Sequence, residues 1–220
     1  MTIEQEPKVK EILSEEARQK KSRIYDISED NLKFKEKAGK YIDFLNANAY
    51  DKERDVRTNI AGEFQKSNLA AALQTAELIC GRLDEDKIYE ALSQIRISGR
   101  MEEIAPGIIV DVSHNIQGMQ GFVQTVEANY HGMKKRILFA ASHQNEEEYM
   151  KNILKTIPEI EAFYTVGIHK RRIDEAEFQD AFRKMIDRNQ ETTVCFVVGS
   201  FYLAGMAKEF INQEEENVRL

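Results

Sequence analysis

The chain has 220 residues, of which 42% are apolar, and a formal net charge of −7 from 31 lysines and arginines against 38 aspartates and glutamates. This apolar share is enough for a packed core and excludes a disordered chain, and the length suits one large domain or two small ones. The acidic balance argues against a nucleic-acid binder held by phosphate contacts, and no apolar run reaches the roughly 20 residues of a membrane span.

The start of the chain and its two cysteines both indicate a cytoplasmic protein. Residues 1–7 are acidic and lack the basic region followed by an apolar one that marks a secretory signal peptide. Cys80 and Cys195 stand in apolar stretches, so we expect buried, reduced thiols, which suit the cytoplasm. A disulfide between them stays open but unsupported.

The first part of the chain mixes helices with short strands. Residues 7–20 have the spacing of an amphipathic helix, and a short strand is predicted at 23–26. Alternating apolar residues and turn formers over 31–60 favour antiparallel strands or hairpins. Two further helices are predicted at 66–80 and 85–95.

The second part alternates short β-branched runs with amphipathic helical patterns. The predicted strands are 107–110, 136–141, 162–166 and 193–198, and the predicted helices are 115–130, 146–156, 174–188 and one after Ser200. Continuous apolar runs of this length are typical of strands buried on both faces of a sheet. The alternation predicts an α/β fold with right-handed crossovers, a mainly parallel Rossmann-like sheet and helices on both faces.

The difference in strand content between the two parts predicts one partial domain and one complete domain. We expect residues 1–98 to form a partial α/β or α+β domain, residues 99–104 a linker, and residues 105–220 a complete C-terminal domain. The helices of the first part have little sheet to pack on. We therefore expect exposed apolar faces and lower stability there, with dimerisation or partial disorder as the consequence.

Polar residues follow each predicted strand, at the edge where open parallel sheets bind ligands. These segments are 111–115 (DVSHN), 142–145 (SHQN), 169–172 (HKRR) and 199–200 (GS). Helix capping explains one polar residue of 111–115 but not all of them, so we favour a functional site there.

The remaining segments have ordinary interpretations beside functional ones. His143 is expected to be a solvated loop residue, and 170–172 is either an exposed turn or an anion-binding triplet. Gly199 with Ser200 fits a close approach to a ligand or merely a tight turn. The other basic triplet, 134–136, precedes its strand and is interpreted as solubilising charge at the opposite edge.

Common catalytic motifs are absent from these 220 residues. The sequence has no P-loop of the form GxxxxGK[ST], no HExxH, no GxSxG, no paired CxxC and no GxGxxG. It therefore predicts no catalytic residue and no metal ligand of its own.

Several segments read together form a recognisable series of motifs. Residues 98–102 (SGRME) precede 111–115 (DVSHN), residues 62–73 read GEFQKSNLAAAL, and residues 198–205 read VGSFYLAG. In this order they resemble the GR-x-E, DGAHN, HQ-x-x-N-A and T-G-S-L-Y-L-x-G segments of the folylpolyglutamate synthase/dihydrofolate synthase family, in the Mur ligase superfamily. Residues 5–17 resemble the late central domain of that family, so the resemblance covers nearly the whole chain.

This resemblance implies the C-terminal portion of an ATP-dependent amide ligase, with residues 1–98 as part of the central ATPase domain. In such an enzyme ATP phosphorylates a carboxylate of folate or pteroate, and the amine of L-glutamate attacks the acyl phosphate with the help of Mg²⁺. By resemblance, Asn68, Arg100 and Asp111 contact the adenine and ribose of ATP. His114 and Ser200 hold the L-glutamate.

The chain also departs from the family pattern. The P-loop, the Mg²⁺ ligands and the modified lysine of the family all precede the point that corresponds to residue 1, so the chain alone is expected to be inactive. Val112, Phe64, Gln144 and Met206 replace a glycine, a histidine, an aspartate and a glutamate of the family motifs.

Three hypotheses follow from these departures. The leading one is a ligase portion, whose expected partner is a separate N-terminal ATPase chain or a second copy. The alternative is a non-catalytic binding or interaction module that keeps the ligase C-domain fold. A third is an unrelated doubly wound protein that binds another small anion at the same edge.

Overall fold

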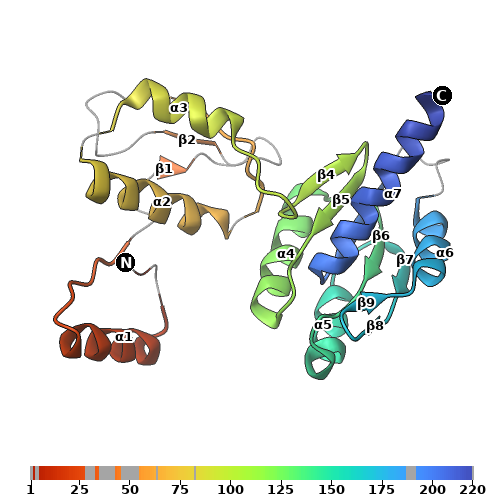
Figure 1. The fold of residues 1–220 in the computed structure, drawn as a ribbon, viewed down its shortest axis with the longest axis horizontal. Helices are drawn as coiled ribbons and strands as arrows, with labels where there is room; N and C mark the ends of the chain where they lie inside the picture. Colours follow the sequence, from red (N-terminus) through yellow and green to blue (C-terminus); the bar gives the residue numbers. More distant parts are fainter. Residues whose placement is uncertain are drawn as a thin grey trace. The chain divides into compact units, whose positions relative to one another are not determined.

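The structure is a computed structural model that describes residues 2, 5–27, 33–34, 43–45, 55–62, 64–81, 83–186 and 192–219 (Figure 1). The chain divides into two compact units, Met1–Arg96 and Ile97–Leu220. Each unit has its own sheet and its own buried apolar cluster. Among the helices described in either unit, none has both the length and the apolar composition needed to cross a bilayer.

The first unit combines a small antiparallel sheet with helices. Strands β1 (Lys33–Phe34), β2 (Asp43–Leu45) and β3 (Asp55–Arg57) pair in that order, which confirms the antiparallel strands predicted within 31–60. The helices are α1 (Pro7–Gln19), α2 (Gln65–Cys80) and α3 (Glu85–Gln94). A buried apolar cluster described in this unit consists of Ile27, Leu69, Ala70 and Leu92.

Apolar side chains stay exposed on the helices of this unit. Helix α1 has no buried residue, although Pro7 at its first position and the apolar spacing after it favour a helix. At the end of α2, Ile79 is 77% exposed. The neighbouring Cys80 is exposed as well, so the prediction of a buried thiol there was wrong. The strand predicted at 23–26 is also absent, because Asp26 forms only an isolated bridge with Thr2.

The second unit is a five-stranded sheet in the order β4-β5-β10-β6-β7. Its strands are β4 (Glu102–Ala105), β5 (Ile108–Asp111), β6 (Lys134–Phe139), β7 (Ile160–Thr165) and β10 (Thr193–Val198). Every pairing is parallel except that of β4 with β5. A separate hairpin joins β8 (Ile168–His169) to β9 (Arg172–Ile173).

Helices cover both faces of this sheet. They are α4 (Ile116–Asn129), α5 (Glu147–Leu154) after the short 3-10 turn η2 (Gln144–Glu146), α6 (Glu175–Met185) and α7 (Phe201–Arg219). Val110, Leu138 and Val197 pack with the apolar residues of α6 and α7. On the opposite face, Phe196 lies edge-on to the Phe122 ring of α4, with ring centroids 5.5 Å apart.

Side-chain caps explain where two of these helices begin. The Asn115 side chain accepts a hydrogen bond of 2.7 Å from the Gly118 amide at the start of α4. Asp174 accepts one of 2.9 Å from the Glu177 amide at the start of α6. Each bond satisfies an amide that the first helical turn leaves free.

The architecture confirms the predicted α/β class, with a mostly parallel sheet and helices on both faces. The structure differs over 99–104, where a linker was expected. Residues 102–105 form β4, an antiparallel edge strand of the second sheet.

The basic triplet 134–136 is not a solubilising surface, which corrects the interpretation drawn from the sequence. Lys135 is fully buried, and its ammonium group donates a 2.8 Å hydrogen bond to Glu159. Arg136 Nε donates to Glu161 at 2.9 Å, and its Nη1 donates to the carbonyl of Met185 at 3.1 Å. The triplet begins β6 and ties it to the start of β7.

Candidate functional site

Three strand ends meet at one edge of the second sheet. The last residue of β10, Val198, is in register with Asp111 of β5 and with Phe139 of β6. The residues that follow these strands therefore come together, as the sequence predicted. The His114 ring lies 5.5 Å from that of Phe201 and 6.4 Å from that of His143, measured between centroids.

Asp111 is a fully buried acidic residue at this edge. Its Oδ1 accepts hydrogen bonds from the amide and the hydroxyl of Ser113, at 2.8 and 2.5 Å, and its Oδ2 accepts one of 2.9 Å from the Met101 amide. Burial raises the pKa of Asp111, and these hydrogen bonds and the nearby Arg100 charge oppose that rise. The carboxylate thus shapes the local backbone; the direct ribose contact implied by the family resemblance stays a prediction.

Arg100 sits in the middle of a tight turn that packs against the end of β5. Gly99 and Met101, on either side of it, both have positive φ, at 70° and 44°. The Val112 amide donates a 2.8 Å hydrogen bond to the carbonyl of Gly99. A Cβ at Gly99 would come within 2.8 Å of Val112, so this position needs glycine for both its conformation and its packing.

His114 is half-buried and has a defined ring orientation. Its Nδ1 lies 3.0 Å from the carbonyl oxygen of Val112. Because a carbonyl only accepts hydrogen bonds, Nδ1 carries the proton in this contact, and Nε2 of the neutral ring is left as an acceptor. An imidazole held in this way can receive a hydrogen bond from a ligand at the edge.

Ser200 is fully buried and directly precedes α7. Its Oγ accepts a 3.1 Å hydrogen bond from the Tyr202 amide. Gly199 before it has φ 109°, and a Cβ there would come within 2.6 Å of both the Ala140 carbonyl and the Phe139 ring. The close approach at Gly199 is therefore to the protein's own backbone. At the start of α7, Phe201 is 58% exposed and Tyr202 is exposed as well.

Asn68 belongs to the first unit. It lies in α2, is exposed, and donates from Nδ2 to Oε1 of the buried Gln65 at 2.7 Å. Asn68 thus lies in a helix, as the resemblance implied. The other four residues lie near one another in the second unit: Arg100, Asp111, His114 and Ser200.

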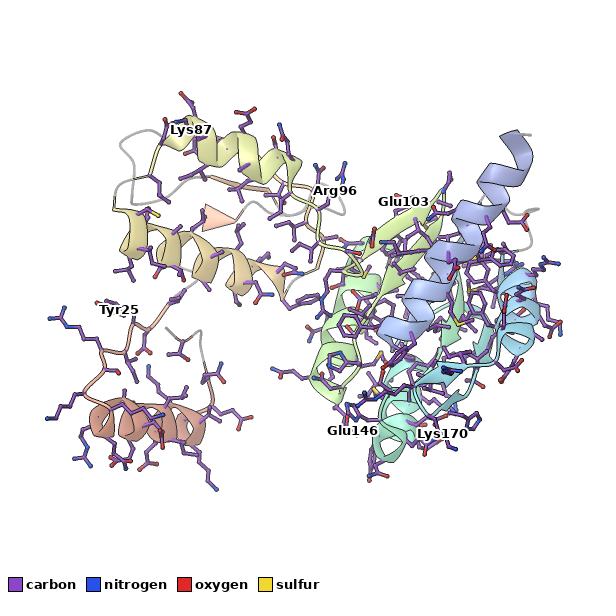
Figure 2. The ribbon with its side chains drawn as sticks, viewed as in Figure 1. Tyr25, Lys87, Arg96, Glu103, Glu146 and Lys170 are labelled. Atoms are coloured by element: carbon purple, nitrogen blue, oxygen red, sulfur yellow. The ribbon has the colours of Figure 1, made fainter. Side chains whose placement is uncertain are left out.

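The 169–172 segment forms the tip of the β8–β9 hairpin. Lys170 and Arg171 occupy its turn with positive φ and are exposed, and Figure 2 shows Lys170 at the outer end of the hairpin. This agrees with the ordinary interpretation of an exposed turn. Within the residues that the structure describes, no three His, Cys, Asp or Glu side chains come together as metal ligands.

Two charged residues near Arg100 were not singled out from the sequence. Glu102 accepts hydrogen bonds from the Gly99 amide at 2.6 Å and from Lys208 at 2.8 Å. The glutamate is the last residue of the SGRME motif, which carried the resemblance but gave it no role. Lys208 has no sequence signal, because it lies 106 residues away from Glu102, in α7.

The fold of the second unit matches that of the C-terminal domain in folylpolyglutamate synthase structures. One matching structure is a point mutant of the L. casei synthase, with a TM-score of 0.74 and 18% identity over 96% of this chain. The Thermotoga maritima synthase matches with a TM-score of 0.67 and 21% identity over 96% of this chain. E. coli FolC in complex with ADP matches with a TM-score of 0.72 and 14% identity over 93%.

The chain spans about half the length of these proteins, namely 52%, 53% and 51% of each. No protein-family model and no curated protein matches the sequence. At these identities the similarity establishes a shared fold. The resemblance inferred from the motifs is confirmed at that level.

Proposed function

We propose that this chain is the C-terminal portion of a folylpolyglutamate synthase-like ligase that contributes nucleotide and L-glutamate contacts to an ATP-dependent glutamate ligation. Asn68, Arg100 and Asp111 would contact ATP, with Asp111 also supporting the turn of Arg100. His114 and the start of α7 at Ser200 would hold L-glutamate. Folate or pteroate would be the acceptor, and Mg²⁺ would be bound by residues outside this chain.

The observation that carries the proposal is the hydrogen-bonded joint between the SGRME turn and the DVSHN segment. The Met101 amide binds Asp111, and the Val112 amide binds the Gly99 carbonyl. Two motifs that resemble the family are thereby assembled into one edge site, in a fold shared with the synthases. The E. coli relative is in complex with ADP, which supports a nucleotide as the first ligand to test.

Each proposed ligand fits the chemistry at this edge. The Arg100 guanidinium is permanently charged and can pair with a phosphate or stack on a base. The free Nε2 of His114 can accept a hydrogen bond from the ammonium group of an amino acid. The amide-rich first turn of α7 favours a carboxylate.

Two observations favour the alternative, a non-catalytic interaction module. Both carboxylate oxygens of Asp111 already accept hydrogen bonds from the protein's own donors, and the side chain is fully buried. A ribose would have to compete with those donors. In addition, the exposed Phe201 gives the edge an apolar contact that suits a protein partner.

Calorimetric titration of the purified chain separates the two functions. We expect saturable binding of ATP and of L-glutamate, with ATP affinity reduced in Arg100→Ala and unchanged in Arg171→Ala, an exposed arginine of the β8–β9 turn. No binding of either ligand by a folded sample would favour the module. We also expect no ligation of glutamate by the chain alone. Ligation by this 220-residue chain would contradict the proposal that it supplies only part of the active site.

A further inference from the structure

Lys208 joins α7 to the turn that carries Arg100. From the middle of α7 its Nζ donates to Oε1 and Oε2 of Glu102 at 2.8 and 3.0 Å, and to Ser98 Oγ at 2.9 Å. One ammonium group therefore uses all three of its donors on the two ends of the same turn. The side chains of Lys208 and Glu102 are 35% and 27% exposed, so the pair is partly shielded from water.

Glu102 also forms hydrogen bonds with the turn itself. Its Oε2 accepts from the Gly99 amide at 2.6 Å and from the Ser98 hydroxyl at 3.3 Å. Burial raises the pKa of Glu102, but the hydrogen bonds from Lys208 and Gly99 outweigh it, so the pKa lies below its ordinary value. The carboxylate is thus ionised at neutral pH and is bonded both to the turn and to α7.

The other side of the turn is held by β5. The Met101 amide donates to Asp111, and the Gly99 carbonyl accepts from Val112. Between these two sets of bonds, Gly99 and Met101 adopt left-handed backbone conformations that a non-glycine residue such as Met101 rarely keeps without support. The support on one side comes from Asp111 and on the other from Glu102 and Lys208.

We infer that Lys208 is a positioning residue for Arg100: by fixing Glu102 and Ser98 it holds the turn in the one conformation that presents the guanidinium at the sheet edge. The inference rests on the proposed function, since it takes Arg100 to be a nucleotide contact. An arginine presented from a fixed backbone loses less freedom on binding than one on a mobile turn. Loss of Lys208 should therefore weaken nucleotide binding without removing any group that touches the nucleotide.

A plain surface ion pair predicts a different outcome. Such pairs contribute little to stability and nothing to a ligand contact elsewhere. Positioning predicts instead that the effect of Lys208 on ATP binding passes entirely through Arg100. The two possibilities differ in a double-mutant cycle.

The test is ATP titration calorimetry on four proteins: wild type, Lys208→Met, Arg100→Ala and the double variant. We expect Lys208→Met to weaken ATP binding by about three- to tenfold in the wild-type background and not at all in the Arg100→Ala background. Lys208→Arg, which keeps charge and donors, should restore most of the affinity. An unchanged affinity in Lys208→Met, or an equal loss in both backgrounds, would overturn the inference.

Two further measurements keep this test separate from that of the proposed function. Lys184→Met is the matched control, because Lys184 forms a similar 2.6 Å ion pair with Asp180 on α6, away from the turn; ATP affinity should not change. Should wild type bind no ATP, the proposed function fails, and amide exchange at Gly99 and Met101 decides the positioning role. Faster exchange at both amides in Lys208→Met supports it, and unchanged exchange overturns it.

Discussion

The amide of Met101 donates a 2.9 Å hydrogen bond to the buried carboxylate of Asp111, ten residues further along the chain. This bond joins the turn before β4 to the end of β5. It also leaves Asp111 with donors on both oxygens. Asp111 is therefore first of all a residue that builds the edge site, whichever ligand that site receives.

Asp111→Asn should lower the free energy of unfolding by about 1–3 kcal/mol, because the carboxamide nitrogen cannot accept the bonds that one carboxylate oxygen now receives. Urea denaturation measures the change. Asp174→Asn is the matched control, since Asp174 is an exposed helix cap and asparagine caps equally well. Equal effects of the two substitutions would contradict this account of Asp111.

Gly199→Ala should strongly destabilise the second unit. The new Cβ would overlap the carbonyl of Ala140 and the ring of Phe139, and φ of 109° is unfavourable for alanine. Gly205 lies within α7 with no heavy atom near its added Cβ, so Gly205→Ala should stabilise by about 0.5–1 kcal/mol. Thermal melts of the two variants should shift in opposite directions, and a shift in the same direction would refute the argument.

Stability should depend on the ion pair between the buried Lys135 and Glu159. Glu159→Gln leaves the fully buried ammonium of Lys135 without its 2.8 Å carboxylate and should lower the urea midpoint clearly. Lys135→Met removes the charge and keeps the apolar stem, so its midpoint should fall less. If Lys135→Met proved the more damaging of the two, the lysine would have to be stabilised by something other than Glu159.

The contribution of Glu102 to the stability of the turn that contains Arg100 should be lost in acid. The folded-state pKa of Glu102 lies below its ordinary 4.5, so its contribution to stability is present above that value and is lost as the pH falls through the lowered pKa. The stability difference between wild type and Glu102→Gln should therefore be largest near neutral pH and shrink below about pH 4.5. Denaturation curves from pH 3 to 7 test this, and a difference that grows in acid would have the wrong sign.

The two thiols should differ sharply in reactivity. Burial raises the pKa of Cys195 to about 11, whereas Cys80 is exposed at the end of α2. In the folded protein at pH 8, a thiol reagent should titrate one cysteine per chain, and none in Cys80→Ser. Two reactive thiols in the native protein would show that the second unit opens.

The parallel strands could be predicted because burial on both faces requires continuous β-branched runs, such as 193–198. Strand β4 was missed because two of its four residues are glutamates, as suits an edge strand, and its pairing depends on a neighbouring strand. The exposure of Cys80 contradicted its apolar neighbours, because α2 ends there. Composition alone cannot tell an apolar helix end that is covered from one that is exposed.

The location of the edge site could be predicted from the sequence, but the side-chain pairs that support the fold and the site could not. Asp111, His114 and Ser200 were predicted as site residues because they follow predicted strands. Arg100 was predicted from the order of the motifs. The burial of Lys135 depends on Glu159, 24 residues away, and the turn of Arg100 depends on Lys208. Such pairs become visible only when distant segments are folded together.

The position of β10 has a consequence for the order of folding. It is the last strand among the described residues, yet it lies between β5 and β6, with Cys195 in register with both Ile108 and Arg136. During synthesis the earlier strands therefore emerge without their common neighbour and keep open edges until residues 193–198 leave the ribosome. The second unit must complete its sheet late, and a chain interrupted before β10 would leave one open edge on each of the apolar strands β5 and β6, which invites aggregation.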